Sequence, residues 1–239
     1  MPALAAVAFD IIGTTFALDA MRPALDRLGL PPRALEFIYT ATLRDSFALA
    51  CTSRYVPFKA VMAGALDEAL AIEGLTPPTQ ARAAALEGLA ALEAYPDAGA
   101  SFRALRDAGL RVVALSNGSE AATRKLLERN ALAALCTDVL SVEDVKLSKP
   151  RPEVYLYAAR SLGLEPAALA LVATHPWDVH GAMAAGLRGG YVARGRPWPD
   201  CFAAPDVTGE TLAEVARALI EGGSAPRARL GTRSGHDTM

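Results

Sequence analysis

The stretch "AAVAFDIIGTTF", residues 5–16, combines an apolar run with a carboxylate at its end. Asp10 closes the run, and Gly13 and two threonines follow at once. A strand that served only packing would not need this carboxylate, although an aspartate in such a place is most often a turn former or a helix cap. The role of Asp10 therefore depends on what stands at the ends of the other strands.

Further apolar runs predict the remaining strands of a sheet. They cover residues 3–9, 111–115, 168–173 and 190–192, with a weaker fifth run at 138–140. Continuous apolar runs are typical of parallel strands, because helices cover both faces of a parallel sheet. Amphipathic patterns predict helices between these runs, over residues 101–109, 119–130, 151–163 and 176–186. This alternation predicts an α/β fold with a doubly wound parallel sheet, that is, a Rossmann-like core.

The region 18–95 is different, because it contains no convincing strand pattern. Several helices are expected there, interrupted at "LPPR" (30–33), "SRYVPF" (53–58) and "LTPPT" (75–79). A helical block of this size between the first two strands predicts an inserted helical cap domain over 18–95. The core then consists of residues 1–17 and 96–221, and the polar, basic and aperiodic segment 222–239 is expected to be a disordered tail.

Composition excludes several classes of partner. A hydrophobic content of 52% supports a packed core, and a net charge of −2 gives no case for binding nucleic acid or an anionic membrane. The three cysteines, Cys51, Cys136 and Cys201, are widely spaced and odd in number, which favours reduced thiols. With neither a basic leader pattern nor an apolar run of membrane-spanning length, we expect a cytoplasmic protein.

Polar side chains gather at the predicted carboxyl ends of the strands, where open α/β sheets carry their chemistry. They are Asp10 with Thr14, Ser116 with Asn117, Lys149 in a loop, and His175 with Asp178. Together they offer a nucleophilic carboxylate, oxygen-stabilising donors and a cation that balances charge. Taken one at a time, Thr14 and Ser116 fit the role of turn or helix-cap residues equally well, and Lys149 fits a solvated lysine in a loop.

Four motifs carry a resemblance to a known family: "FDIIGTTF", "LSNGS", "SKPRPEVY" and "HPWDVHGA". In this order and spacing they resemble the haloacid dehalogenase superfamily, and within it the L-2-haloacid dehalogenase (type II) branch. The likeness extends over about residues 4–220, and "RYVPF" in the helical region resembles the same branch. The resemblance implies a hydrolase that acts on short-chain (S)-2-haloacids, without a cofactor or metal, and a homodimer.

The same resemblance implies roles for individual residues. Asp10 would displace halide from C2 and form an ester, whose carbonyl carbon water then attacks. Thr14 and Ser116 would hydrogen-bond Asp10, Lys149 would stabilise its carboxylate, and Asp178 would pair with Lys149 and position water. The expected substrate-binding residues are Ile11, Tyr39, Asn117, Tyr155 and Trp177, although Tyr155 and Trp177 also fit a role in the core.

A phosphatase is the main alternative, because many proteins with this kind of fold are phosphatases. Such a site typically has a second aspartate two positions after the nucleophile, where this chain has Ile12, which cannot donate a proton. It also has an acidic magnesium ligand where this chain has Thr174. Both differences favour dehalogenation, since halide leaves as an anion and needs no acid. A catalytically silent binding protein is the third possibility.

The sequence also departs from the dehalogenase branch. Tyr39 stands where the branch has an arginine, and Arg44, further along the same helix, could replace that cation only if the helix were shifted. His175 stands where the branch usually has asparagine. This histidine is either a strand-end residue bonded to the backbone or a base that deprotonates the hydrolytic water, because its unperturbed pKa lies near neutrality.

Overall fold

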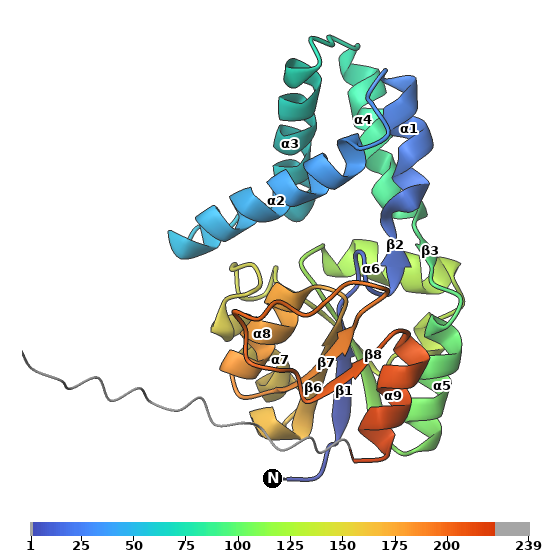
Figure 1. Ribbon diagram of the computed structural model, residues 1–239, viewed down its shortest axis with the longest axis vertical. Coiled ribbons are helices and arrows are strands. Elements are labelled where there is room, and N and C mark those ends of the chain that lie inside the picture. Colours follow the sequence, from blue (N-terminus) through green and yellow to red (C-terminus); the bar gives the residue numbers. More distant parts are fainter. Residues whose placement is uncertain (1, 223–239) are drawn as a thin grey trace, which may run out of the picture.

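The computed structural model describes residues 2–222 and contains a six-stranded parallel sheet (Figure 1). The strands are β1 (Ala6–Phe9), β4 (Arg111–Ser116), β5 (Asp138–Ser141), β6 (Leu169–Ala173), β7 (Arg188–Val192) and β8 (Val207–Gly209). Their order in the sheet is β5-β4-β1-β6-β7-β8, so the first strand lies near the middle. Every apolar run that predicted a strand forms one, and the α/β fold is confirmed.

Helices cover both faces of this sheet, which explains why its strands are apolar throughout. Phe9 of β1 belongs to the core cluster that contains Phe102 of α5 (Ala98–Asp107) and Val215 of α9 (Leu212–Ile220). Ala8, which points to the other face, packs in a second cluster with Val154 of α7 (Pro152–Ser161). Since successive side chains of a strand alternate between faces, both sets must be apolar.

The predicted helix ends agree with the structure. The helix α6 (Glu120–Arg129) begins after Ser119, whose hydroxyl accepts a hydrogen bond from the Ala122 amide. Gly109, beyond the end of α5, has a φ of +82°, the left-handed conformation that glycine adopts most easily. The helix α8 (Pro176–Ala184) starts at its proline, a residue suited to the first turn because it lacks an amide hydrogen.

The strand β8 and the final helix α9 were not predicted from the sequence. A strand of three residues, Val207–Gly209, is too short to show a period. The helix α9 did carry a signal: Thr211 accepts a hydrogen bond from the Glu214 amide, and Glu214 in turn accepts one from the Glu210 amide. This is close to the reciprocal arrangement of a capping box, whose Thr-x-x-Glu spacing is visible in the sequence.

A group of helices built from residues 18–91 lies beyond the carboxyl edge of the sheet, at the top of Figure 1, and is called the helical group below. It contains η1 (Leu18–Met21), α1 (Arg22–Arg27), α2 (Ala34–Cys51), α3 (Phe58–Ile72), α4 (Thr79–Glu87) and η2 (Gly88–Ala91). The breaks after α1, α2 and α3 fall at the three predicted interruptions, which are rich in proline. The helical group therefore faces the edge at which the polar residues gather.

Two short strands join the helical group to the sheet. Phe16–Ala17 (β2) pairs antiparallel with Glu93–Ala94 (β3). The expectation of no strand within 18–95 is therefore wrong at Glu93 and Ala94. The chain leaves the sheet through β2 and returns through β3, and the two strands pair because these segments lie side by side in space. No local sequence pattern reveals this. The Tyr95 amide donates to the Thr15 carbonyl, and the Thr15 hydroxyl donates to the Asp10 carbonyl at 2.7 Å. The crossing is thus tied directly to the end of β1.

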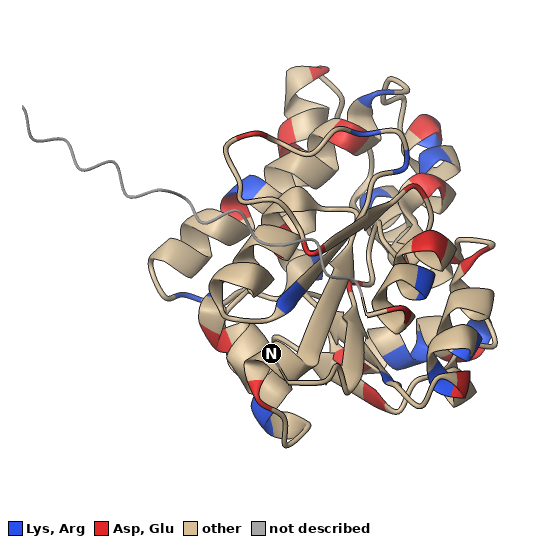
Figure 2. Cartoon of the chain, turned by 60° about the horizontal axis from the view of Figure 1, so that its bottom comes forward, with Lys and Arg blue, Asp and Glu red and all other residues tan. Residues whose placement is uncertain are grey.

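Positive and negative residues are intermingled on the side of the molecule that Figure 2 shows, where Lys and Arg residues lie among Asp and Glu residues on the helices and loops. Within residues 2–222, none of the helices has the length and apolar character needed to cross a membrane. Cys51, Cys136 and Cys201 are all free thiols. Of the predicted tail, residues 223–239 lie outside the described part of the chain.

Replacing Phe102 with alanine tests whether α5 is anchored as described. Its ring lies 4.5 Å from that of Phe9, centroid to centroid, and both are buried. Removing it should lower the free energy of unfolding by about 3–5 kcal/mol, measured in equilibrium denaturation with urea. Phe37→Ala is the control, because this ring is 37% exposed, and it should cost about 0.5 kcal/mol or less. Equal losses for the two variants would contradict the assignment of the core.

Candidate active site

The candidate site begins where β1 ends, with β4 on one side and β6 on the other. Phe9 pairs with Ala114 of β4 and with Val172 of β6, so Asp10 follows at the centre of the sheet edge. The Asp10 amide donates to the Val172 carbonyl at 3.0 Å, and the residue is only 5% exposed. Binding sites of open α/β sheets form at this kind of position, where the connections on either side run to opposite faces.

Lys149 connects two carboxylates at this edge. Its Nζ lies 3.1 Å from Asp10 Oδ1 and 2.8 Å from Asp178 Oδ2. The lysine side chain and that of Asp178 are fully buried, so Lys149 is not a solvated loop residue. A buried ammonium is tolerated only when partners compensate its lost hydration, and here two carboxylates do so. The loop before α7 thus places its cation between the ends of β1 and β6.

The three charges set one another's ionisation. Burial by itself raises the pKa of Asp10, but the ammonium of Lys149, the nearby His175 and the hydrogen bond from Thr14 outweigh it and hold the pKa below its usual value. Burial raises the pKa of Asp178, Lys149 opposes this, and Asp10 adds to it, so this pKa lies above its usual value. Asp10 is therefore the more acidic of the two carboxyls.

Thr14 holds the second oxygen of Asp10. Its hydroxyl donates to Asp10 Oδ2 at 2.7 Å and accepts from the Thr174 amide at 3.0 Å. Among the described residues, no hydrogen bond joins Ser116 to Asp10 as the resemblance implied; Ser116 Oγ accepts from the Gly118 amide at 2.9 Å. The tight turn after β4 brings this amide over the hydroxyl. The proton of the Ser116 hydroxyl is left for another acceptor.

Asn117 and Tyr155 support the charged groups from behind. Asn117 Oδ1 accepts from the Lys149 amide at 3.0 Å, which positions the loop that carries the lysine. The Tyr155 hydroxyl donates to Asp178 Oδ1 at 2.6 Å, and its ring is fully buried in the core on the α7 side of the sheet. Contact of Tyr155 with substrate, expected from the sequence, is therefore not supported. Its hydroxyl is used to orient Asp178.

Tyr39 and His175 meet above the loop that follows Asp10. The Tyr39 hydroxyl, from α2, lies 3.0 Å from His175 Nε2 and donates to the Ile12 carbonyl at 3.2 Å. His175 Nε2 is 3.0 Å from that same carbonyl and 3.5 Å from Asp10 Oδ2. Burial, and then the charges of Asp10 and Asp178, raise the pKa of Tyr39 well above its usual value, so the phenol is neutral.

The backbone at Gly13 makes room for this histidine. Gly13 has a φ of +85°, and a Cβ there would lie 2.8 Å from His175 Nε2. Both the conformation and the close approach require glycine. His175 is thus bonded to the backbone, as expected of a strand-end residue. It also lies close to the Asp10 carboxylate, as a role in the reaction requires.

Trp177 links the end of β6 to the helical group. Its ring stacks on that of His175, with centroids 5.5 Å apart and planes at 15°, and meets Phe47 of α2 edge-on at 5.0 Å. Arg44 does not face the site, because its guanidinium is exposed and pairs with Asp45 and Glu68. Among the described residues, the helical group therefore brings Tyr39 rather than an arginine to the carboxylate.

The two positions that distinguish the phosphatase pattern are occupied by groups with other uses. Thr174 Oγ1 donates to the Gly13 carbonyl at 3.0 Å and lies 3.2 Å from Thr14 Oγ1. Ile12 packs against the apolar core and offers only its carbonyl. Within residues 2–222, no group of three or more His, Cys, Asp or Glu side chains is arranged to hold a metal ion.

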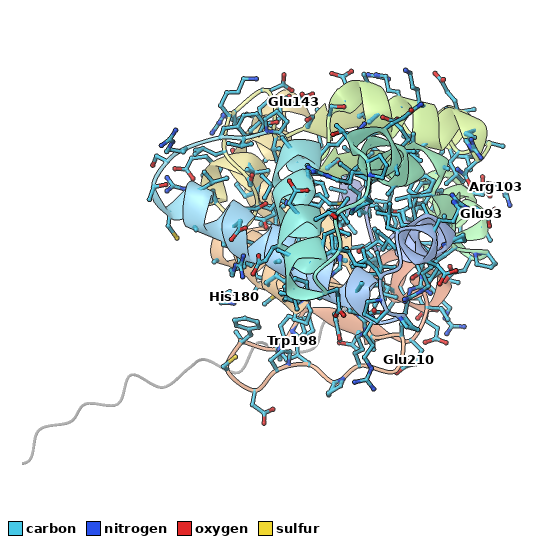
Figure 3. All side chains as sticks on the ribbon, turned by 90° about the horizontal axis from the view of Figure 1, so that it is seen from above. Glu93, Arg103, Glu143, His180, Trp198 and Glu210 are labelled. Carbon is cyan, nitrogen blue, oxygen red and sulfur yellow. The ribbon has the colours of Figure 1, made fainter. Side chains whose placement is uncertain are left out.

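A cleft of about 350 Å³ lies between the helical group and α6. Its inner end is formed by Ile11 and Ser116, and its outer walls include Phe58 of α3 and Leu86 of α4. In Figure 3, Glu143, which lines the cleft, lies at the edge of the molecule opposite His180 and Trp198. Phe58 and Leu86 could not be identified from the sequence, because apolar helix residues there look the same whether they face a core or a cleft.

The geometry agrees with comparisons to known proteins. The chain is 30% identical over 223 residues to (S)-2-haloacid dehalogenase 1 of Pseudomonas sp. (strain CBS-3), which covers 92% of this chain and 98% of the relative. It is 32% identical over 193 residues to the (S)-2-haloacid dehalogenase of Xanthobacter autotrophicus, covering 79% of this chain and 75% of the relative.

A solved structure extends this likeness to the whole fold. The L-2-haloacid dehalogenase from Xanthobacter autotrophicus with chloropropionic acid covalently bound superposes with a TM-score of 0.83, at 26% identity, over 90% of this chain and 98% of that chain. The family model for haloacid dehalogenase-like hydrolases matches residues 4–186. The chain therefore belongs to the haloacid dehalogenase-like hydrolases and, within them, to the L-2-haloacid dehalogenase branch.

Proposed function

We propose that this protein hydrolyses the carbon–halogen bond of short-chain (S)-2-haloacids through an ester on Asp10. The observation that carries the proposal is the state of this carboxylate: it is 5% exposed, yet Lys149 at 3.1 Å and Thr14 at 2.7 Å keep it ionised. A dehydrated but ionised carboxylate is a stronger nucleophile than one in water. The names of its relatives support the same reaction.

Residues 18–95 act in this proposal as a cap domain that removes water from the site. Tyr39 and Phe47 bring α2 against His175 and Trp177, so the helical group covers the end of β1. Closing an active site in this way strengthens every electrostatic interaction inside it. The cap thus gives Asp10 the dry surroundings that its reaction needs.

In the first step, one oxygen of Asp10 attacks C2 of the substrate. The new carbon–oxygen bond forms as the carbon–halogen bond breaks, and the halide departs with the bonding electrons. The Ser116 hydroxyl keeps its proton for the substrate carboxylate, since its oxygen is already bonded to the Gly118 amide. The Asn117 amide nitrogen serves the same purpose, because Asn117 binds Lys149 through Oδ1 and, within residues 2–222, no hydrogen bond from its nitrogen is found. Ile11 and Trp177 supply apolar contact.

In the second step, water attacks the carbonyl carbon of the Asp10 ester, which frees the hydroxyacid and restores the carboxylate. Because Asp10 is esterified at this stage, Asp178, whose pKa is raised, is the aspartate that can accept the proton of the water. His175 also acts on this step. With a proton on Nε2 it stabilises charge on Asp10 Oδ2, and without one it takes the proton of the water.

The reaction itself is tested by measuring halide release. Purified protein treated with a chelator should release halide from (S)-2-chloropropanoate and (S)-2-bromopropanoate, and should not hydrolyse p-nitrophenyl phosphate, because Ile12 and Thr174 lack the groups that a phosphatase uses. Asp10→Asn should release none. Phosphate release that depends on added magnesium would favour the phosphatase, and silence toward every substrate would favour a binding protein.

The ester on Asp10 is tested by a single turnover in heavy-oxygen water with enzyme in excess. Because the product receives its oxygen from Asp10, the first product should be unlabelled and the peptide that contains Asp10 heavier by one label, as measured by mass spectrometry. If Asp10 were only a base, the label would appear in the product and not in the peptide. That outcome would exclude the proposed nucleophile.

The role of His175 is tested with His175→Gln and His175→Asn. Since His175 acts on hydrolysis, the glutamine variant should turn over at least about ten-fold more slowly and accumulate the Asp10 adduct, detected by mass after quenching during turnover. Asparagine, the residue usual in the branch, should restore part of the rate. Slow turnover without an adduct would place His175 in the first step, and normal turnover would leave it a structural residue.

A further inference from the structure

The cleft opens next to the end of β1, and its lining begins with Ile11 and Ile12, the two residues that follow Asp10. Residues Phe9 and Ala114 are paired in the sheet, so Ile11 and Ser116, which form the inner end of the cleft, stand level with each other one residue beyond Asp10. From there the cleft passes between the helical group and the first two turns of α6. A group attached to the carbon that Asp10 attacks can therefore extend into it.

The walls of the cleft are mostly apolar. Ile11, Ile12, Phe58, Leu86, Leu89 and Leu126 contribute from both the sheet and the helical group. Small residues, Ala90 on η2 and Ala121 and Ala122 on α6, keep the passage wide. A halopropanoate has a single methyl group at this position and would leave most of this surface in contact with water. Binding is favoured when a ligand covers such apolar surface, because the surface is then removed from water.

Charges at the outer rim are balanced. Lys59 pairs with Glu87 at 2.6 Å, and Glu143, which accepts a hydrogen bond from the Glu120 amide at 3.1 Å, lies on the same rim as Lys125. With two lysines and two glutamates, the rim has no net charge. The rim therefore gives no electrostatic advantage to a substituent with a second charge, and the lining favours a neutral one.

We propose that the cleft is a subsite for the substituent on C2, and that the substrates used best are 2-haloacids with a longer unbranched alkyl chain. This rests on the proposed dehalogenase function but extends its substrate class beyond the short-chain acids. The volume, about 350 Å³, falls in the range of pockets that enclose ligands much larger than a propanoate. Each methylene placed in it should raise kcat/KM by about three- to four-fold until the rim is reached.

The test compares (S)-2-bromopropanoate, 2-bromobutanoate, 2-bromohexanoate and 2-bromooctanoate by halide release. With the unchanged protein, kcat/KM should rise along the series. The variant Ala122→Leu, which narrows the cleft from α6, should lower kcat/KM for 2-bromohexanoate by about ten-fold or more and leave 2-bromopropanoate within about two-fold. Ala84→Leu on α4 is the matched control, since this exposed alanine does not line the cleft, and it should change neither value.

Each other outcome has a separate meaning. Equal losses for short and long acids in Ala122→Leu would identify the cleft as a route of entry and overturn the subsite. A flat or falling series in the unchanged protein, with Ala122→Leu acting like the control, would also overturn it. Absence of halide release from every acid would instead reject the dehalogenase function itself, so the two failures are distinguishable.

Discussion

The whole site depends on one buried cation between two buried carboxylates. Lys149 makes it possible for Asp10 and Asp178 to lie at the same sheet edge, out of water, without both taking up protons. In return, the two carboxylates keep the pKa of Lys149 above its usual value although burial lowers it. Removing Lys149 would leave two buried carboxylates with no cation between them, so the arrangement depends on this lysine.

The surrounding contacts can be understood as support for this unit. Tyr155 bonds Asp178, Asn117 accepts from the backbone amide of Lys149, and Thr14 and His175 approach the remaining oxygen of Asp10. The three central charges sum to one negative charge, which an anionic substrate would meet on entering. The groups that could bind the substrate carboxylate here are neutral: Ser116 and Asn117 on the sheet edge, and Tyr39 on α2 at the position where the branch has an arginine. A substrate that gains much of its binding from an apolar chain suits such a site.

Most of the fold and part of the site were predictable from the sequence. The strands were recognised because parallel strands are apolar on both faces, and Asp10 and Lys149 stood out because polar residues at strand ends converge. For two side chains the structure shows a partner that the sequence did not indicate. Ser116 accepts from the Gly118 amide, and Tyr155 donates to Asp178. A sequence names a donor but does not say which acceptor lies nearest.

The sequence by itself determined five of the six strands of the sheet, the breaks between the helices of residues 18–95, and the set of residues that could react, because these follow from local periodicity and from the order of motifs along the chain. Only the tertiary structure decided that Tyr39 meets His175, that Arg44 points away, and that an apolar cleft opens beside Ile11. These features depend on how the helical group sits on the sheet. That position is set by many weak packing contacts between residues far apart in the chain, and no local pattern records them.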